Sequence, residues 1–568
     1  MRKAWALAAA LVLGLLLAVY ATVPPRPLPA DAPQAGFSAA RAMADVREIA
    51  RAPHPTGSAE NARVRSFLAD RLTSLGAQAR LADFPLQGSP AKVLATWSGA
   101  PAPPQVTDVV GVVPGRDRAA PAIVLMAHYD TVWASPGAAD DSAGVAAVLE
   151  IVRALKAGPP PARDLVVLFT DGEELGLVGA RGWFTQPGTS ARVGAVVNLE
   201  SRGGGGRAAM FETGRRNGGI MRLFAREVRH PSATSFSTFV YELLPNNTDF
   251  TPAKAAQLPG LNFAFIGRPE LYHSPAATPE RLDQGALQDM GAQALDAVRA
   301  LTRATTTPRP GPNLVFFDVF SLFLIHYPPL WGWAVLAAAA ALYGWAGVSS
   351  DECRSRVGLG AVGSLLLLTA TGALLFAANI LSGAGKGANY YDRLAAIPLL
   401  MVQAVLLTAA ALSLVLGWTR SRGGDGGRTA LGLAAPPLLL GIAAQIAAPL
   451  IAFLIAWPLL AAGAVAALVV RNAGPARTGV AAIVSAVGLG YVLSLAFFLF
   501  QGVGPDMPWV LALLVALAAC LLAPLTPSVA TRRLLLPAGG LVIAAVLVAV
   551  WVRLDPVAPT VAPYSLKR

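Results

Sequence analysis

Three short apolar runs between residues 120 and 200 are each followed at once by acidic or imidazole side chains. The run IVLMA at 123–127 leads into His128, DLVVLFT at 164–170 leads into the sequence DGEE, and VGAVVNL at 193–199 leads into Glu200. Runs of this length that are rich in Val, Leu and Ile predict buried β-strands. We therefore expect three strands whose ends carry polar residues.

Segments with apolar residues at helical spacing lie before and between these runs. The first is AENARVRSFLADRLTSLG at 59–76, the second is AGVAAVLEIVRALKA at 143–157, and a third helix is expected near LVGARGWF at 177–184. Alternation of strands and helices predicts an α/β domain with a mainly parallel sheet and helices on both faces.

The pattern changes after TTTPRPGPN at 305–313, which has the composition of a linker. Residues 316–329 are expected at a membrane interface, and the apolar runs beyond them predict eight membrane-spanning helices. The expected spans are 331–348, 357–381, 396–418, 430–447, 450–470, 479–500, 508–527 and 534–552.

An apolar run from Ala4 to Val23 follows Arg2 and Lys3 and is also long enough to cross a bilayer. A cleavable signal peptide is the alternative, although the run is long for one and lacks a clear small-residue cleavage site. The chain then divides into five expected parts. These are an N-terminal transmembrane anchor at 1–23, the α/β domain at 24–306, a linker or interfacial segment at 307–330, an all-α polytopic transmembrane domain at 331–552 and a tail at 553–568.

Composition agrees with a membrane protein. With 54% hydrophobic and only 14% charged residues, the chain is too apolar for an ordinary soluble protein, and a lipid bilayer is its expected partner. The net charge of +12 comes from basic residues spread along the chain without aromatic neighbours, so we expect no nucleic-acid partner. The two cysteines, Cys353 and Cys520, lie outside the α/β domain, which therefore has no disulfide and no thiolate ligand.

Basic residues in the loops predict the orientation. With the N-terminus in the cytoplasm, the cytoplasmic loops hold nine arginines and the opposite loops hold only Lys386 and Arg393. Loops rich in Lys and Arg stay on the cytoplasmic side of a membrane. We therefore expect the α/β domain and the tail on the non-cytoplasmic side, in a periplasm, a lumen or the cell exterior.

The polar residues at the strand ends suggest a metal site. Parallel strands that end at one sheet edge would bring together His128, Asp140, Glu174 and Glu200. Imidazole and carboxylate ligands without thiolate suit catalytic zinc, with manganese or cobalt as alternatives. Of the five histidines, His273 in LYHSPAATPE is the candidate for a further ligand, whereas His54 in RAPHPTGS is expected to be a loop residue.

Five motifs in this order and spacing resemble the M28 family of zinc peptidases. They are HYD at 128–130, ADDSAG at 139–144, DGEELG at 171–176, NLE at 198–200 and YHSP at 272–275, within a resemblance that covers roughly residues 40–305. The third-strand ligand is often Asp in secreted members of this family. Glu200 departs from that pattern and is similar to the membrane-anchored branch that includes the vacuolar membrane proteases.

The resemblance implies two zinc ions per chain and a peptide substrate. Asp140 would bridge the ions, His128 and Glu200 would complete one site, and Glu174 and His273 the other. Glu173 would be the general base, and Asp130 would accept a hydrogen bond from the His128 ring. Tyr272 would stabilise the oxyanion or form a pocket wall, and Asp249 in NNTDF would line the substrate pocket.

The expected function is that of a membrane-bound exopeptidase that removes residues from free peptide N-termini. Two alternatives come from the same resemblance: glutaminyl cyclases, which share the fold but bind one zinc, and binding proteins that have lost ligands or the base. A transporter is a further alternative. Gln403, Asn379 and Gln445 are the most polar residues in the predicted spans, whereas ion pathways usually place ionisable groups there.

Overall fold

The computed structural model describes residues 2–385, 388–424, 426–470, 474–527 and 532–554. Two compact units emerge: Val23–Tyr327 forms an α/β unit, and helix α1 together with α12–α20 forms a helical bundle. Residues 555–568 of the predicted tail, Lys386 and Arg471 lie outside the described residues.

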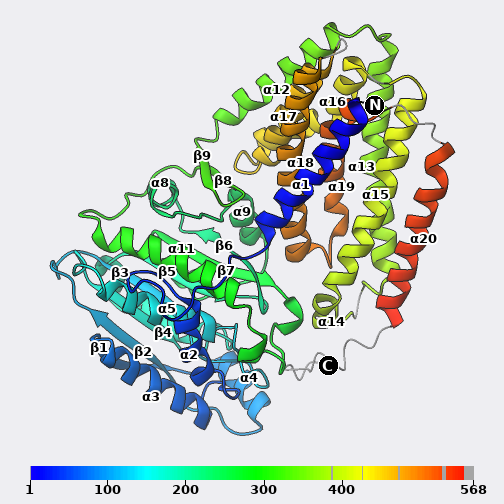
Figure 1. Cartoon of the computed structure of the whole chain (residues 1–568). Coiled ribbons are helices and arrows are strands. Elements are labelled where there is room, and N and C mark those ends of the chain that lie inside the picture. Colours follow the sequence, from blue (N-terminus) through cyan, green and yellow to red (C-terminus); the bar gives the residue numbers. More distant parts are fainter. Residues whose placement is uncertain (1, 386–387, 425, 471–473, 528–531, 555–568) are drawn as a thin grey trace. The chain divides into compact units, whose positions relative to one another are not determined.

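The α/β unit is built on a seven-stranded sheet in the order β1-β2-β4-β3-β5-β7-β6 (Figure 1). Its strands are β1 (Gln78–Pro85), β2 (Gln105–Val113), β3 (Ala122–His128), β4 (Leu165–Thr170), β5 (Val193–Ser201), β6 (Gly205–Thr213) and β7 (Gly260–Gly267). Strands β4, β3, β5 and β7 are parallel, which confirms the expectation for the three apolar runs. The outer strands β1, β2 and β6 are antiparallel to their neighbours, so the sheet is mixed.

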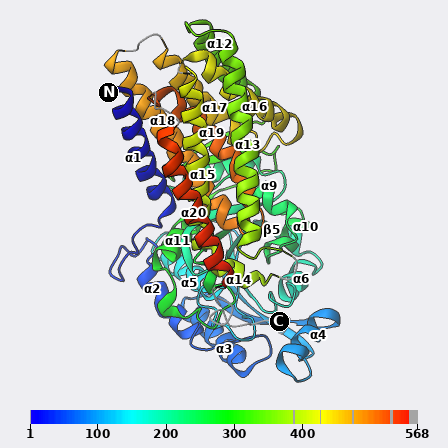
Figure 2. The same ribbon diagram turned by 90° about the vertical axis from the view of Figure 1, so that its right-hand side faces the viewer.

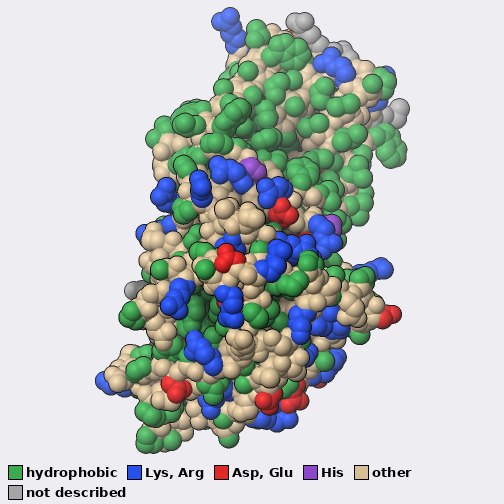
Figure 3. Space-filling view, turned by 90° about the vertical axis from the view of Figure 1, so that its left-hand side faces the viewer, with side chains coloured by type: hydrophobic (Ala, Val, Ile, Leu, Met, Phe, Trp, Pro, Cys, Tyr) green, Lys and Arg blue, Asp and Glu red, His purple; other side chains and the backbone are tan. Residues whose placement is uncertain are grey.

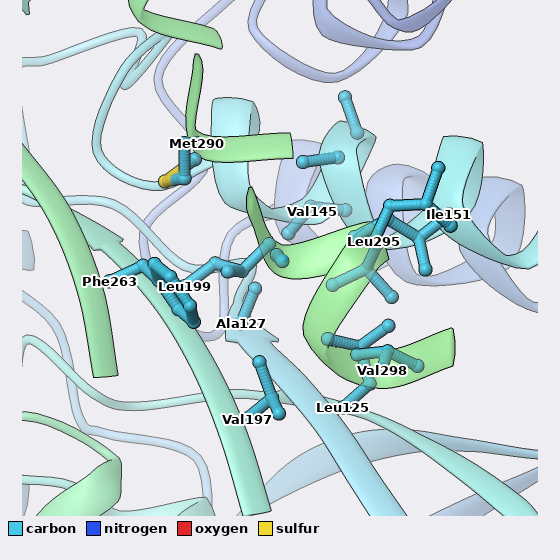
Figure 4. Packing of buried hydrophobic residues seen from close by; sticks show 14 of the residues in the cluster. Leu125, Ala127, Val145, Ile151, Val197, Leu199, Phe263, Met290, Leu295 and Val298 are labelled. Carbon is cyan, nitrogen blue, oxygen red and sulfur yellow. The ribbon is translucent and has the colours of Figure 1, made fainter. Parts of the chain in front are cut away.

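Helices cover both faces of this sheet. They are α2 (Ala39–Ile49), α3 (Ala59–Ser74), α4 (Gly88–Ser98), α5 (Ser142–Lys156), α6 (Val178–Phe184), α7 (Thr189–Arg192), α8 (Gly218–Glu227), α9 (Ser235–Leu243), α10 (Phe250–Ala255) and α11 (Gln284–Arg303). Side chains of a strand alternate between the faces. In β3, Leu125 and Ala127 pack with α5 and α11, whereas Val124 and Met126 pack in the cluster that includes α6 and α10. Figure 4 shows the first of these clusters.

The segment expected at a membrane interface forms a β-hairpin of β8 (Val315–Val319) and β9 (Phe323–Tyr327). Phe316 and Leu324 belong to the same hydrophobic core as α5 and α11. The apolar residues of this segment are therefore explained in part by packing within the α/β unit.

The bundle contains a helix for each predicted span. These are α1 (Arg2–Thr22), α12 (Trp331–Val348), α13 (Ser355–Leu381), α15 (Ile397–Ser421), α16 (Gly427–Ala447), α17 (Phe453–Val469), α18 (Pro475–Val503), α19 (Leu511–Leu522) and α20 (Arg532–Leu554), with the short α14 (Tyr390–Ala395) between two of them. Eight helical segments of the described chain are long and apolar enough to cross a membrane, and α17 is a shorter apolar helix. Figure 2 shows α13, α15 and α20 on one side of the bundle, where α15 packs against both α13 and α20.

The outer surface of the bundle is apolar. Large hydrophobic side chains such as Leu366, Phe376 and Leu547 are exposed, and Figure 3 shows hydrophobic atoms over most of the visible bundle surface. Water-soluble proteins rarely expose an apolar surface of this extent. It fits the hydrocarbon interior of a bilayer.

Helix α1 packs along α18 through small residues. A Cβ atom on Gly490 would lie 2.8 Å from the Leu17 Cβ and 3.0 Å from the Gly14 carbonyl oxygen. Only glycine fits at such a distance, and close backbone approach through small residues is a common way for helices to pack in membranes.

Candidate metal centre

The site lies where the parallel strands of the α/β unit end. His128 is the last residue of β3, Glu200 is the penultimate residue of β5, and Glu173 and Glu174 occupy the turn after β4. Asp140 precedes α5, where the side chain of its neighbour Asp141 caps the helix by accepting from the Gly144 N–H. Asp141 therefore caps the helix, whereas the side chain of its neighbour Asp140 lies at the site.

His273 reaches the site from the segment that follows β7. A 3-10 turn, Pro269–Leu271, separates it from the strand, and His273 itself has a left-handed backbone with φ of 55°. This conformation is uncommon for residues other than glycine, although histidine adopts it more readily than most. Such a conformation at a ligand candidate agrees with the tendency of backbone strain to occur at functional sites.

All five predicted metal ligands come together in two triads that share Asp140. Asp140 Oδ1 lies 3.1 Å from His128 Nε2, and Asp140 Oδ2 lies 3.1 Å from His273 Nε2. Glu200 Oε1 is 3.5 Å from His128 Nε2, and Glu174 Oε1 is 3.0 Å from His273 Nε2. In each triad the three ligand atoms lie within 4.8 Å of one another, which is the spacing of atoms around one ion.

The charges of the site favour bound cations. Burial alone would lower the pKa of both histidines, but the neighbouring carboxylates outweigh it. Glu174 and Asp140 raise the pKa of His273 to about 9, and Glu200, Asp130 and Asp140 raise that of His128 well above its usual value. Protons on the imidazoles thus balance the carboxylates, and divalent ions would take the place of these protons.

The donor set also fits zinc. Oxygen Oε2 of Glu200 is buried and has no hydrogen-bond partner among the described residues. This is expected for an oxygen that coordinates a metal ion. Two imidazole nitrogens and three carboxylates, without sulfur, are typical of catalytic zinc sites. The residues present are therefore suited to hold two such ions.

Glu173 stands beside the triads without belonging to either of the two that share Asp140. Its carboxylate lies within 4.8 Å of ligand atoms of His128 and Glu174. Burial, together with the charge of Glu200 and other carboxylates, raises its pKa well above the usual value although the His128 charge opposes this. A carboxyl group with a raised pKa is suited to accept and return a proton near neutral pH.

Asp130 supports both His128 and the turn that carries Glu173. The closest acceptor to His128 Nδ1 is the Asp130 backbone oxygen at 3.0 Å, whereas the carboxylate oxygen Oδ1 is 3.5 Å away. The same carboxylate accepts the backbone N–H groups of Glu173 at 3.0 Å and Glu174 at 3.3 Å. Asp130 therefore orients the ring mainly through its main chain and holds the glutamate turn through its side chain.

Two further predicted residues lie close to the triads. The Tyr272 ring stacks on His273 with 3.8 Å between ring centroids. Asp249 is buried and accepts a hydrogen bond from the Thr170 hydroxyl at the end of β4. Its expected place in the wall of the substrate pocket stays a prediction. Thr56 and Asn61, for which the sequence predicts no role at the site, also contact the buried carboxylates of Asp171 and Asp130 beside it.

Comparison with known proteins identifies a family for part of the chain. Residues 108–298 match the model of peptidase family M28. Endoplasmic reticulum metallopeptidase 1 of Mus musculus is 33% identical over 231 residues, which are 39% of this chain and 26% of that protein. Vacuolar membrane protease of Candida dubliniensis is 31% identical over 259 residues, which are 44% of this chain and 27% of that protein. These matches confirm the resemblance to the membrane-anchored branch of the family, although the chain matches only about a quarter of the length of these relatives.

Among solved structures, an aminopeptidase from Aneurinibacillus sp. strain AM-1 is similar to part of this chain. It has a TM-score of 0.39 at 13% sequence identity and covers 49% of this chain and 97% of that chain.

Proposed function

We propose that this chain, which carries a domain of peptidase family M28, is a membrane-bound zinc exopeptidase that acts on free peptide N-termini. The observation that supports this most directly is the position of Asp140, whose two carboxylate oxygens each lie 3.1 Å from a different histidine. A carboxylate placed in this way is suited to bridge two metal ions.

His128, Asp140 and Glu200 would hold one ion, and Asp140, Glu174 and His273 the other. When bound, the two ions would supply Lewis acidity, which lowers the pKa of a water molecule and polarises the scissile carbonyl. Glu173 would take a proton from the attacking water and pass it to the leaving amine, because it is the carboxylate beside the triads that neither of them needs.

The remaining residues would orient these groups. Asp130 fixes the glutamate turn and the His128 ring through the contacts described above. Tyr272 would keep the His273 ring in place by stacking, and its hydroxyl would donate to the oxyanion of the substrate.

Preference for a free N-terminus follows from the two proposed ions. A dinuclear site would offer one ion as a partner for the free amine of a peptide next to the scissile carbonyl. An acetylated terminus and an internal peptide bond have no free amine at this position.

The bundle is proposed to anchor this domain on the non-cytoplasmic side of its membrane. Within the candidate spans that the structure describes, Asp, Glu, Lys, Arg and His occur only within three residues of a helix end. Ion pathways usually need such groups deeper in the membrane, so anchoring or substrate presentation is favoured over transport.

The test is a peptide library with free and acetylated N-termini, incubated with the zinc-loaded full chain and read by mass spectrometry. Stepwise loss of N-terminal residues from the free set alone is expected. Equal cleavage of both sets would point to endopeptidase or carboxypeptidase action. Cyclisation of N-terminal glutamine without peptide-bond cleavage would point to glutaminyl-cyclase chemistry.

A further inference from the structure

The segment His54–Asn61 lies outside the region that matches the family model, yet three of its polar side chains are buried. Exposure is 1% for His54, 4% for Thr56 and 1% for Asn61. The segment leads into α3, where the Ser58 side chain caps the helix by accepting from the Asn61 N–H. Buried polar groups need partners, and these partners lie directly behind the metal centre.

Thr56 and Asn61 both donate hydrogen bonds to the buried carboxylate of Asp171. The Thr56 hydroxyl is 2.8 Å from Asp171 Oδ1, and Asn61 Nδ2 is 3.2 Å from the same atom. The Thr107 N–H donates to Asp171 Oδ2 at 3.3 Å. The Asp171 carboxylate is thus held on both oxygens, with two of its three donors supplied by side chains of segment 54–61.

Asp171 is the first residue of the turn that carries Glu173 and Glu174. The Gly179 N–H closes the turn on the Asp171 carbonyl oxygen at 3.0 Å, and Gly172 has a left-handed backbone with φ of 76°. Glu173 and Glu174 are bound through their N–H groups to Asp130, and Asp130 Oδ2 lies 3.5 Å from the Thr56 hydroxyl. Thr56 therefore contacts both carboxylates that hold the turn.

We propose that Thr56 and Asn61 are positioning residues that fix the Asp171–Glu174 turn, and so place the base Glu173 and the ligand candidate Glu174. The roles of these two glutamates rest on the function proposed above. Neither Thr56 nor Asn61 is proposed to touch the substrate or a metal ion. They act mainly through Asp171, whose carboxylate would otherwise lose both side-chain donors and shift together with the turn. Thr56 also contacts the Asp130 carboxylate.

The test compares Thr56→Val and Thr56→Ser in the full chain. Valine keeps the shape of threonine but loses the hydroxyl, and serine keeps the hydroxyl. Thr73→Val makes the same exchange on an exposed turn of α3, where the hydroxyl donates to the Ala69 carbonyl oxygen, and is the matched control. Each variant is measured for kcat and KM on a peptide with a free N-terminus, for zinc affinity against a chelator, and for hydrogen exchange in residues 171–179.

Thr56→Val is expected to lower kcat or zinc affinity by about 10–100-fold, the usual range for residues that support metal ligands. KM should change by less than about threefold, because substrate contacts remain. Amides of the turn should exchange faster, whereas Thr56→Ser and Thr73→Val should resemble the wild type. Asn61→Ala, which leaves the Thr56 bond in place, should change the same quantities in the same direction by less, and replaces Thr56→Val should that variant fail to fold.

Wild-type kcat, zinc affinity and exchange in a folded Thr56→Val chain would overturn the proposal, as would an equal loss in Thr56→Ser. Hydrogen exchange in residues 171–179 and zinc affinity can be measured without any peptidase activity. If the wild-type chain has no peptidase activity, the proposed function is contradicted. The two measurements would still decide whether Thr56 and Asn61 position the turn.

Discussion

The Glu173 backbone N–H donates a 3.0 Å hydrogen bond to Asp130 Oδ1, so the base candidate is anchored by its main chain and not by its carboxylate. A change confined to the Glu173 carboxylate should therefore leave the turn, and Glu174 with it, in place.

Glu173→Gln should reduce kcat by about 10²–10⁴-fold, the range typical of a lost general base. Zinc content should remain at the wild-type level, since neither triad that shares Asp140 includes Glu173. Kinetics and elemental analysis of the same preparation check both outcomes. Glu227→Gln, an exposed position on α8, is the control. A wild-type rate, or a loss of zinc that parallels the loss of rate, would contradict the assignment.

Removal of the shared ligand should differ from removal of a ligand that serves one ion. We expect about two zinc ions per chain in the wild type, about one in His128→Ala, and close to none in Asp140→Asn, because an amide is a far poorer bridge than a carboxylate. Elemental analysis of dialysed protein measures this. A wild-type content of one zinc per chain would favour the cyclase-like alternative.

Zinc binding should release protons at neutral pH. The pKa of His273 is raised to about 9 by Glu174 and Asp140, so the ring is protonated in the metal-free chain at pH 7, and a metal ligand must be neutral. Apparent zinc affinity should therefore rise about tenfold for each pH unit per released proton and should lose this dependence on the His273 proton above about pH 9. Calorimetry in buffers of different ionisation enthalpy counts the protons. Binding without proton release would show that the carboxylates do not hold the imidazole charged.

His54 should make the folded chain sensitive to acid. Burial lowers the pKa of His54 to about 4, against 6.5 for the free side chain. Between these two pH values the unfolded chain binds a proton at His54 that the folded chain does not bind. Stability is then retained above pH 6.5 and lost as the pH falls toward 4, by on the order of 3 kcal/mol from this group. The melting temperature of His54→Gln in detergent should fall less than that of the wild type between pH 7.5 and pH 4.5. Parallel slopes for the two proteins would refute this.

Much of the candidate site could be predicted because three of its five candidate ligands lie just after a strong local signal. His128, Glu174 and Glu200 follow apolar runs that become the central parallel strands. The antiparallel direction of β1, β2 and β6 has no comparable sequence signal, because pairing with neighbouring strands sets it.

The contacts that segment 54–61 makes with Asp171 could not be predicted for a similar reason. Thr56 and Asn61 contact Asp171 across separations of 115 and 110 residues through short polar side chains that follow no periodic pattern. Residues 316–329 were interpreted as interfacial because apolarity alone does not distinguish burial in a protein core from contact with lipid. Phe316 and Leu324 in fact pack in the core of the α/β unit.

The loop charges predict a non-cytoplasmic C-terminus. A reporter that works only in the cytoplasm should be inactive when fused after Arg568. A reporter that works only outside the cytoplasm should be active at the same position. The same reporters placed after Gly423, in a predicted cytoplasmic loop, should give the opposite result. A cytoplasmic signal from the terminal fusion would mean that one helix does not cross. The first candidate is α17, which is shorter than the eight helical segments that are long enough to span a membrane.

The close packing of Gly14 against Gly490 also sets an order of events during synthesis. Helix α1 ends at Thr22 and its partner α18 begins at Pro475, so about 450 residues are made between them. At typical translation speeds this takes on the order of 20–90 s. The whole α/β unit is complete before α18 exists, so α1 must remain in the bilayer without this partner while the domain behind it folds.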